Sequence, residues 1–227
     1  MKPVKPKIVR LIIPLVAVTC VALLVYCQVT GSGLLTAIFR VGSFASLLAV
    51  PLWLLYDRVL WHIPFFRAWD YFCDVPDLRG RWHGTLDRGD ARGSHPFVLE
   101  IAQTMTDIHC VTYSSRSSSR SITAEIVSDS DPKQTLQLVY SWRAEVREDL
   151  DGTPLLDVMI FDGTTVLDIH SGLYRRFDGR YYTNRLPSGT RGRLHLQFDS
   201  PELLHHFELP THEPLSKPAL PPPTATT

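Results

Sequence analysis

The feature that most constrains this chain is an apolar run of nineteen residues, 11–29, without a charged side chain. Nineteen residues rise about 28 Å as an α-helix, close to the roughly 30 Å hydrocarbon core of a bilayer. After a Thr-Gly-Ser-Gly turn, a second run covers residues 34–56 and is interrupted only by Arg40, which can extend toward the headgroups. A cleaved signal peptide fits poorly, because the first run is long and lacks a small-residue cleavage site. We therefore expect a two-helix transmembrane hairpin within residues 1–58.

Basic residues near the two runs predict their orientation. Lys2, Lys5, Lys7 and Arg10 precede the first run, the connecting turn has no basic residue, and basic residues follow the second run. Loops rich in Lys and Arg stay in the cytoplasm, so both ends of the hairpin are expected there. Residues 59–76 are predicted to be an interfacial linker, because aromatic residues cluster at the end of the second run. These are Trp53, Tyr56, Trp61, Phe65, Phe66 and Trp69.

From residue 77 the hydrophobic pattern changes to the two-residue alternation of β-strands. Leu136, Leu138, Tyr140 and Trp142, for example, alternate with more polar neighbours. Strands are expected near 79–87, 95–105, 107–116, 119–128, 134–146, 154–161, 164–175, 180–185 and 191–199. Turn signals between them include Thr106-Asp107, Asp162-Gly163, Asp178-Gly179 and Ser188-Gly189.

Such a meander removes its free edges by closing into a barrel. The predicted fold is therefore a membrane-anchored all-β chain: two N-terminal transmembrane helices, then a small antiparallel up-and-down β-barrel of about eight strands over residues 77–200. Residues 201–227 are rich in proline and poor in apolar residues, so a disordered tail is expected there.

No pattern in the sequence indicates catalysis or metal binding. The serine-hydrolase, zinc-protease and P-loop motifs are absent, and the cysteines show no CxxC spacing. His205, His206 and His212 lie in the predicted tail without a scaffold, so no metal site and no cofactor are expected. The 23 basic and 23 acidic residues balance, which argues against a nucleic-acid polymer as partner. We expect a binding protein and no enzyme.

Aromatic and polar residues on the predicted strands suggest a ligand site inside or beside the barrel. Tyr140, Trp142 and the Tyr181–Tyr182 pair offer flat faces on which a nucleobase could stack, but they fit an ordinary barrel core as well. Arg185 needs an acidic neighbour or an anionic ligand if it is buried. The Ser- and Arg-rich segment 114–121 fits a solvated hairpin tip or a rim that contacts phosphates.

Several short motifs, taken in order, resemble a known family. They are two apolar helices, then Asp77-Leu-Arg-Gly-Arg-Trp-His-Gly84, Ile101-Ala-Gln-Thr104, Leu138-Val-Tyr-Ser-Trp142 and Gly179-Arg-Tyr-Tyr-Thr-Asn-Arg185. This order resembles the SMODS-associated effectors with two transmembrane helices and a β-strand-rich domain, the CD-NTase-associated protein 15 family. The resemblance extends to about Ser200 and leaves out the proline-rich tail.

The resemblance implies an effector of CBASS anti-phage defence in the bacterial inner membrane. A CD-NTase would make a cyclic dinucleotide, the barrel would bind it, and self-association would let the helices disrupt the membrane lipid and kill the cell. An alternative is a membrane-tethered, lipocalin-like barrel for an apolar metabolite or a protein partner. The ligand residues implied are Tyr182, Thr183, Asn184 and Arg185, supported by Trp82, Gln103, Thr104, Tyr140 and Trp142.

Overall fold

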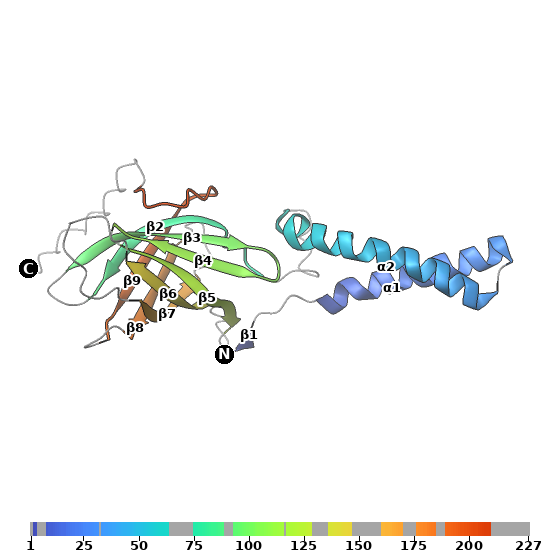
Figure 1. The fold of residues 1–227 in the computed structure, drawn as a ribbon, viewed down its shortest axis with the longest axis horizontal. Coiled ribbons are helices and arrows are strands. Elements are labelled where there is room, and N and C mark those ends of the chain that lie inside the picture. The colour runs from blue at the N-terminus through green and yellow to red at the C-terminus, as the bar shows by residue number, and fades with distance from the viewer. Residues whose placement is uncertain are drawn as a thin grey trace, which may run out of the picture.

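The computed structural model describes two helices, a β-barrel and a C-terminal segment. It covers residues 2–3, 8–31, 33–63, 75–88, 93–115, 117–128, 136–146, 160–169, 176–184 and 189–209. Helix α1 (Ile8–Thr30) and helix α2 (Leu34–Arg58) lie side by side and extend from one end of the barrel (Figure 1). A single 3₁₀ turn, η1 (Leu60–His62), follows α2.

Eight antiparallel strands form a closed barrel, as the alternation predicts. Each strand pairs with the next along the chain, and the last pairs with the first, so the order runs from β2 through β9 and back to β2. A two-residue strand, β1 (Lys2–Pro3), pairs with the end of β5. The barrel strands are β2 (Gly80–Asp87), β3 (Ser94–Gln103), β4 (Ile108–Tyr113), β5 (Ser117–Ser128), β6 (Leu136–Val146), β7 (Phe161–Ile169), β8 (Arg176–Thr183) and β9 (Arg191–Ser200).

The half of the barrel nearer the helices has an apolar core. Trp82 of β2 stacks on Phe177 of β8 with ring centroids 3.9 Å apart, and its Nε1 donates to the Leu78 carbonyl at 3.0 Å. Leucine and isoleucine side chains from strands around the barrel fill the remaining space and are fully buried. This packing follows from the alternation, which turns every second side chain inward.

Two of the predicted turns are wrong. Asp162-Gly163 lies inside β7 and Asp178-Gly179 lies inside β8. These glycines serve close packing: a Cβ on Gly163 would lie 2.4 Å from the Trp142 ring, and one on Gly179 would lie 2.7 Å from a Leu167 methyl. Asp-Gly is a turn signal because glycine accepts unusual backbone angles, but glycine also fits where another group approaches closely. The strand expected at 154–161 lies almost entirely outside the described residues.

The end of α2 is built into the barrel. Tyr56 and Trp61, expected to face the membrane interface, are buried in the same cluster as the barrel core. Asp57 accepts hydrogen bonds from the Thr106 N–H (3.1 Å) and hydroxyl (2.9 Å), and its carbonyl accepts one from the Met105 N–H at 3.1 Å. These contacts join α2 to the β3–β4 turn.

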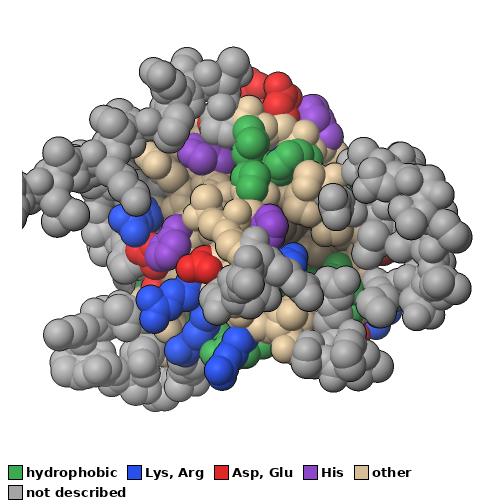
Figure 2. Space-filling view, turned by 90° about the vertical axis from the view of Figure 1, so that its left-hand side faces the viewer, with side chains coloured by type: hydrophobic (Ala, Val, Ile, Leu, Met, Phe, Trp, Pro, Cys, Tyr) green, Lys and Arg blue, Asp and Glu red, His purple; other side chains and the backbone are tan. Residues whose placement is uncertain are grey.

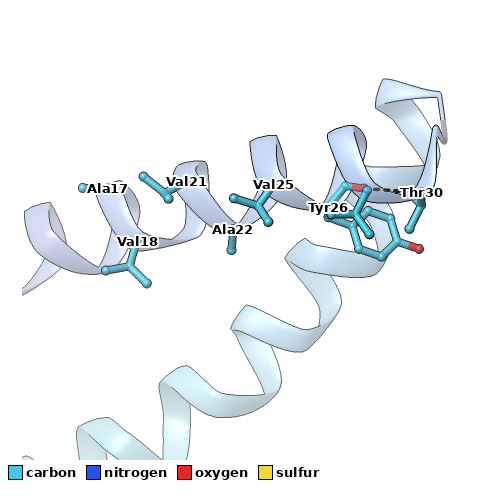
Figure 3. Close-up of a pocket in the computed structure, with 8 residues that line it drawn as sticks. Ala17, Val18, Val21, Ala22, Val25, Tyr26 and Thr30 are labelled. Carbon is cyan, nitrogen blue, oxygen red and sulfur yellow. Dashed lines mark hydrogen bonds between the residues drawn. The ribbon is translucent and has the colours of Figure 1, made fainter.

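The helices meet the sequence expectation in part. Among the described residues, Ile38–Arg58 is long and apolar enough to cross a membrane, and Val16–Thr30 is a shorter apolar segment. Arg40 donates to the Tyr26 hydroxyl on α1 at 2.9 Å, near the loop between the helices. An open apolar groove runs beside α1 between Ala17 and Thr30 (Figure 3). A second transmembrane helix and the topology remain predictions.

Residues 201–209, which the sequence places in the disordered tail, pack on the outside of β2 and β3. We call them the C-terminal strap. The strap covers an ion pair between Arg81 and Glu100, which are 1 % and 2 % exposed and 2.6 Å apart. Residues 210–227 lie outside the described part of the chain, so the predicted disorder is untested there.

Candidate functional site

The barrel has two chemically different ends. The proximal end carries the β3–β4 turn and contacts α2, whereas the distal end points away from the helices (Figure 1). Figure 2 looks onto the distal end, where a hydrophobic patch, histidines and side chains of both charges are exposed. A ligand approaching from solvent meets this end without obstruction by the helices.

Inward positions near the distal end combine aromatic rings with hydroxyl groups, and we call this set the distal mouth. The strand register places these residues on the inner face, because each lies directly opposite another inward residue on a neighbouring strand. Five of the described strands, β4 to β8, contribute hydroxyl groups to it. The mouth comprises Thr112, Ser119, Ser121, Tyr140, Trp142, Thr165, Tyr181 and Thr183.

A hydrogen-bonded cluster forms the floor of the mouth. The Trp142 Nε1 donates to the Thr165 hydroxyl at 2.9 Å. The Tyr140 hydroxyl forms hydrogen bonds with Thr165 and Thr112. Burial raises the pKa of Tyr140, and these two hydrogen bonds lower that pKa by a smaller amount. Tyr140 therefore stays a neutral phenol that can donate or accept a hydrogen bond.

Two glycines hold the aromatic rings against the barrel wall. The Trp142 ring packs on Gly163, and the Tyr181 ring packs on Gly192, where an added Cβ would lie 2.6 Å from the ring. Trp142 is half-buried and also contacts Phe161 edge-on, with centroids 5.8 Å apart. A partly open indole fixed in this way is a suitable stacking surface for a planar base.

The rim of the mouth is held by polar contacts. Arg143 forms an exposed ion pair with Asp162 at 2.9 Å, and the Arg143 guanidinium lowers the pKa of that carboxyl. The Asn184 side chain accepts the Asp162 N–H at 2.9 Å, which ties the end of β8 to β7. The Thr183 hydroxyl lies 2.7 Å from the Thr190 hydroxyl and accepts a hydrogen bond from the Thr190 backbone N–H at 3.0 Å. These contacts hold together the two ends of the β8–β9 connection.

The predicted ligand residues divide between the two ends. Tyr140, Trp142 and Thr183 belong to the distal mouth, and Asn184 lies at its rim. Tyr182 points outward, opposite Arg191, and is 47 % exposed. Arg185 lies outside the described residues.

The other predicted ligand residues lie at the proximal end. The Gln103 amide accepts from the Leu78 N–H at 2.8 Å and donates to the Pro76 carbonyl at 2.9 Å, so it holds the chain that enters the barrel. The Thr104 hydroxyl accepts the Asp107 N–H at 3.0 Å inside the β3–β4 turn. Trp82 is a core residue. The structure does not bring these three side chains together with the mouth.

Sequence reasoning missed one important member of the mouth, Thr165, and did not distinguish Tyr181 from Tyr182. Thr165 binds both Tyr140 and Trp142, and only the pairing of β6 with β7 places it there. The sequence could have distinguished the inward Tyr181 from the outward Tyr182. Alternate residues of a strand share one face, and Tyr181 shares its face with Phe177, Gly179 and Thr183. Within the described residues, no three His, Cys, Asp or Glu side chains form a metal-binding group.

Comparison with protein families decides the relationship of the chain. The family described as the Cap15 cyclic dinucleotide receptor domain matches residues 73–197, more than half of the sequence. The chain belongs to the Cap15 family. This confirms the resemblance seen in the sequence and identifies the barrel as a receptor domain of a Cap15-like CBASS effector, which is a ligand-binding family and not a catalytic one. None of the curated proteins matches the chain.

Proposed function

We propose that this chain is a CBASS effector whose distal mouth binds a cyclic dinucleotide. The observation that carries the proposal is the receptor-domain match over the residues that form the closed barrel. The mouth supports it chemically, because Trp142 offers a stacking face and the hydroxyls of Thr112 and Ser119 can bond to phosphate or base edges. Stacking of one base on an aromatic ring contributes about 1–3 kcal/mol.

The proposed response is self-association of the effector and disruption of the inner membrane by its helices. The N-terminus and barrel would lie in the cytoplasm, where the product of a CD-NTase could reach the mouth. A ligand shifts such an equilibrium only if it binds the assembled state more tightly, and a hundredfold preference corresponds to about 2.7 kcal/mol. No cofactor is required for this mechanism.

Binding is tested on the full chain in detergent micelles. Isothermal titration calorimetry with a panel of cyclic di- and trinucleotides should show saturable binding of at least one cyclic dinucleotide, and a linear dinucleotide of the same bases should bind more weakly. Failure of every cyclic nucleotide to bind would overturn the proposal. Binding confined to fatty acids would support the lipocalin-like alternative.

Membrane disruption is tested with the same protein in liposomes that contain a self-quenched dye. The cyclic dinucleotide that binds should release the dye, and chemical crosslinking should show larger assemblies than in its absence. Binding without dye release or assembly would leave a receptor but reject the effector mechanism.

A further inference from the structure

One junction in the barrel wall is incomplete. Strand β4 pairs with β5 from Val111–Arg120 to Tyr113–Ser118, whereas β5 pairs with β6 along its whole length. A register shift follows Ser121, and its hydroxyl, in place of a backbone carbonyl, accepts the Cys110 N–H at 2.9 Å. Among the described residues, no strand pairs with residues 122–126 on this side of β5. We call this junction the β4–β5 seam.

The distal part of the seam belongs to the mouth. Thr112 of β4 and Ser119 of β5 are register partners with inward side chains, and Ser121 lies one inward position further along β5. Tyr140 contacts Thr112 from the neighbouring strand β6. A ligand bound in the mouth would therefore be able to contact both sides of the seam.

The proximal parts of the same two strands are attached to different helices. The turn that leads into β4 is bonded to Asp57 at the end of α2. The end of β5 pairs with β1, where Lys2 is opposite Ser128 and Pro3 is opposite Val127. Four residues separate Pro3 from the start of α1, so that start lies within about 19 Å of Pro3.

We propose that the β4–β5 seam transmits ligand binding from the distal mouth to the two helices. A ligand that changes the distance between Thr112 and Ser119 also changes the distance between β4 and β5. At their proximal ends, β4 is linked to α2 through Asp57, and β5 is linked to α1 through β1. The short ladder makes the seam the place where the barrel wall deforms at least cost. This inference rests on the proposed function and adds the path by which binding reaches the membrane.

A disulfide across the seam tests the path. Val111 and Arg120 are register partners that point outward, away from the mouth, so Val111→Cys with Arg120→Cys can lock the seam when oxidised. The oxidised protein should bind the cyclic dinucleotide as the reduced form does, but its dye release should fall about tenfold or more, within the usual range of coupling energies. Reductant should restore the release.

The matched control locks a fully paired junction. Ser141 and Thr164 are outward register partners on β6 and β7, so their double cysteine variant should release dye in both redox states. Oxidised wild-type protein controls for the native thiols. Normal release from the oxidised seam variant would overturn the proposal and leave the proposed function intact. Loss of nucleotide binding in that variant would overturn it too, since the seam would then act in binding itself.

The α2 attachment gives a second, independent test. Asp57→Ala removes the acceptor for Thr106, so nucleotide binding should persist while dye release falls; Asp57→Asn keeps an acceptor and should restore release. Asp107→Ala changes an exposed carboxylate in the same turn, leaves the Asp57–Thr106 hydrogen bonds in place and should behave as wild type. Equal release from Asp57→Ala and wild type would contradict the role of this attachment. If the wild type itself neither binds nucleotide nor releases dye, the proposed function fails first.

Discussion

At the scale of single residues, the direction of a side chain separates two neighbouring tyrosines. Tyr181 points inward and packs on Gly192, whereas Tyr182 points outward beside Arg191. Both are aromatic, and both belong to the motif that resembles the family. Only one of them can contribute to a ligand site inside the mouth.

Replacing Trp142 tests the location of that site. Trp142→Ala should weaken cyclic dinucleotide binding about 10- to 100-fold, because a base loses its stacking partner. Tyr182→Ala is the matched control and should leave the affinity unchanged, since its ring lies on the outer surface. Calorimetry of the full chain measures both. A large loss in Tyr182→Ala with none in Trp142→Ala would place the ligand outside the barrel.

The buried thiol of Cys110 should make the stability of the fold depend on pH. Burial raises the pKa of this thiol, so it stays protonated in the folded barrel when the unfolded chain ionises. The free energy of unfolding should therefore fall as pH rises above about 8.5, by at most about 1.4 kcal/mol per pH unit. Tyr140, whose pKa is also raised by burial, adds the same effect above about pH 10.

Unfolding followed by tryptophan fluorescence between about pH 8.5 and 10 measures this slope. Cys110→Ala should be less stable than wild type near neutral pH, but its stability should change less with pH, so the difference should shrink as the pH rises. An equal slope in the variant and the wild type would contradict the assignment.

At the scale of elements, the C-terminal strap completes the outer face of the barrel. The Leu204 N–H donates to the Glu100 carboxylate at 2.9 Å, and the His205 N–H donates to both of its oxygens at 3.2 Å. Arg81 donates to the carbonyls of His206 and Glu208. A buried ion pair needs such additional partners, because its own attraction does not offset the loss of water.

Removing one member of this pair should be costly. Glu100→Ala leaves buried Arg81 with only the more distant Asp199 carboxylate, at 3.7 Å, and should lower the free energy of unfolding by about 3 kcal/mol. Glu125→Ala is the matched control: this carboxylate is exposed on β5, so the change should stay within about 0.5 kcal/mol. Urea unfolding measures the free energy of unfolding of both variants. Similar small decreases in the two variants would show that the strap leaves Arg81 open to water.

The elements also show how far the sequence pattern extends. Alternation predicts β2, β3, β5, β6 and β9 to within two residues at each end. It fails at Asp162-Gly163 and Asp178-Gly179, where the glycines make room for side chains of other strands. The periodicity of a strand does not show which side chain from another strand packs against a glycine.

At the scale of the whole molecule, the helices and the barrel form one connected unit through Asp57, Tyr56 and Trp61. Self-association of such units would bring helix hairpins together. Gly42 and Ala45 lie on α2, and among the described residues a Cβ added at Gly42 meets no atom within 4 Å outside the backbone of its own helix. Larger side chains there should disturb neighbouring copies more than the fold.

The double variant Gly42→Leu and Ala45→Leu tests this interface. Nucleotide binding should remain, while crosslinked assemblies and liposome dye release should decrease, because small residues allow close helix packing in membranes. Leu48→Ala, at an exposed position on the same helix, serves as the control. Release by the double variant equal to wild type would contradict packing through these residues.

The class of this protein could be predicted from its sequence: apolar helices first, then an alternating domain of about eight strands that closes into a barrel. Those features depend on local hydrophobic pattern, which a single chain displays directly. Three facts became visible only in the folded chain. Gln103 and Thr104 lie at the opposite end from Trp142, Thr165 joins the mouth, and the strap covers Arg81. These facts depend on strand register and long-range contact, where residues far apart in sequence meet and local pattern is silent.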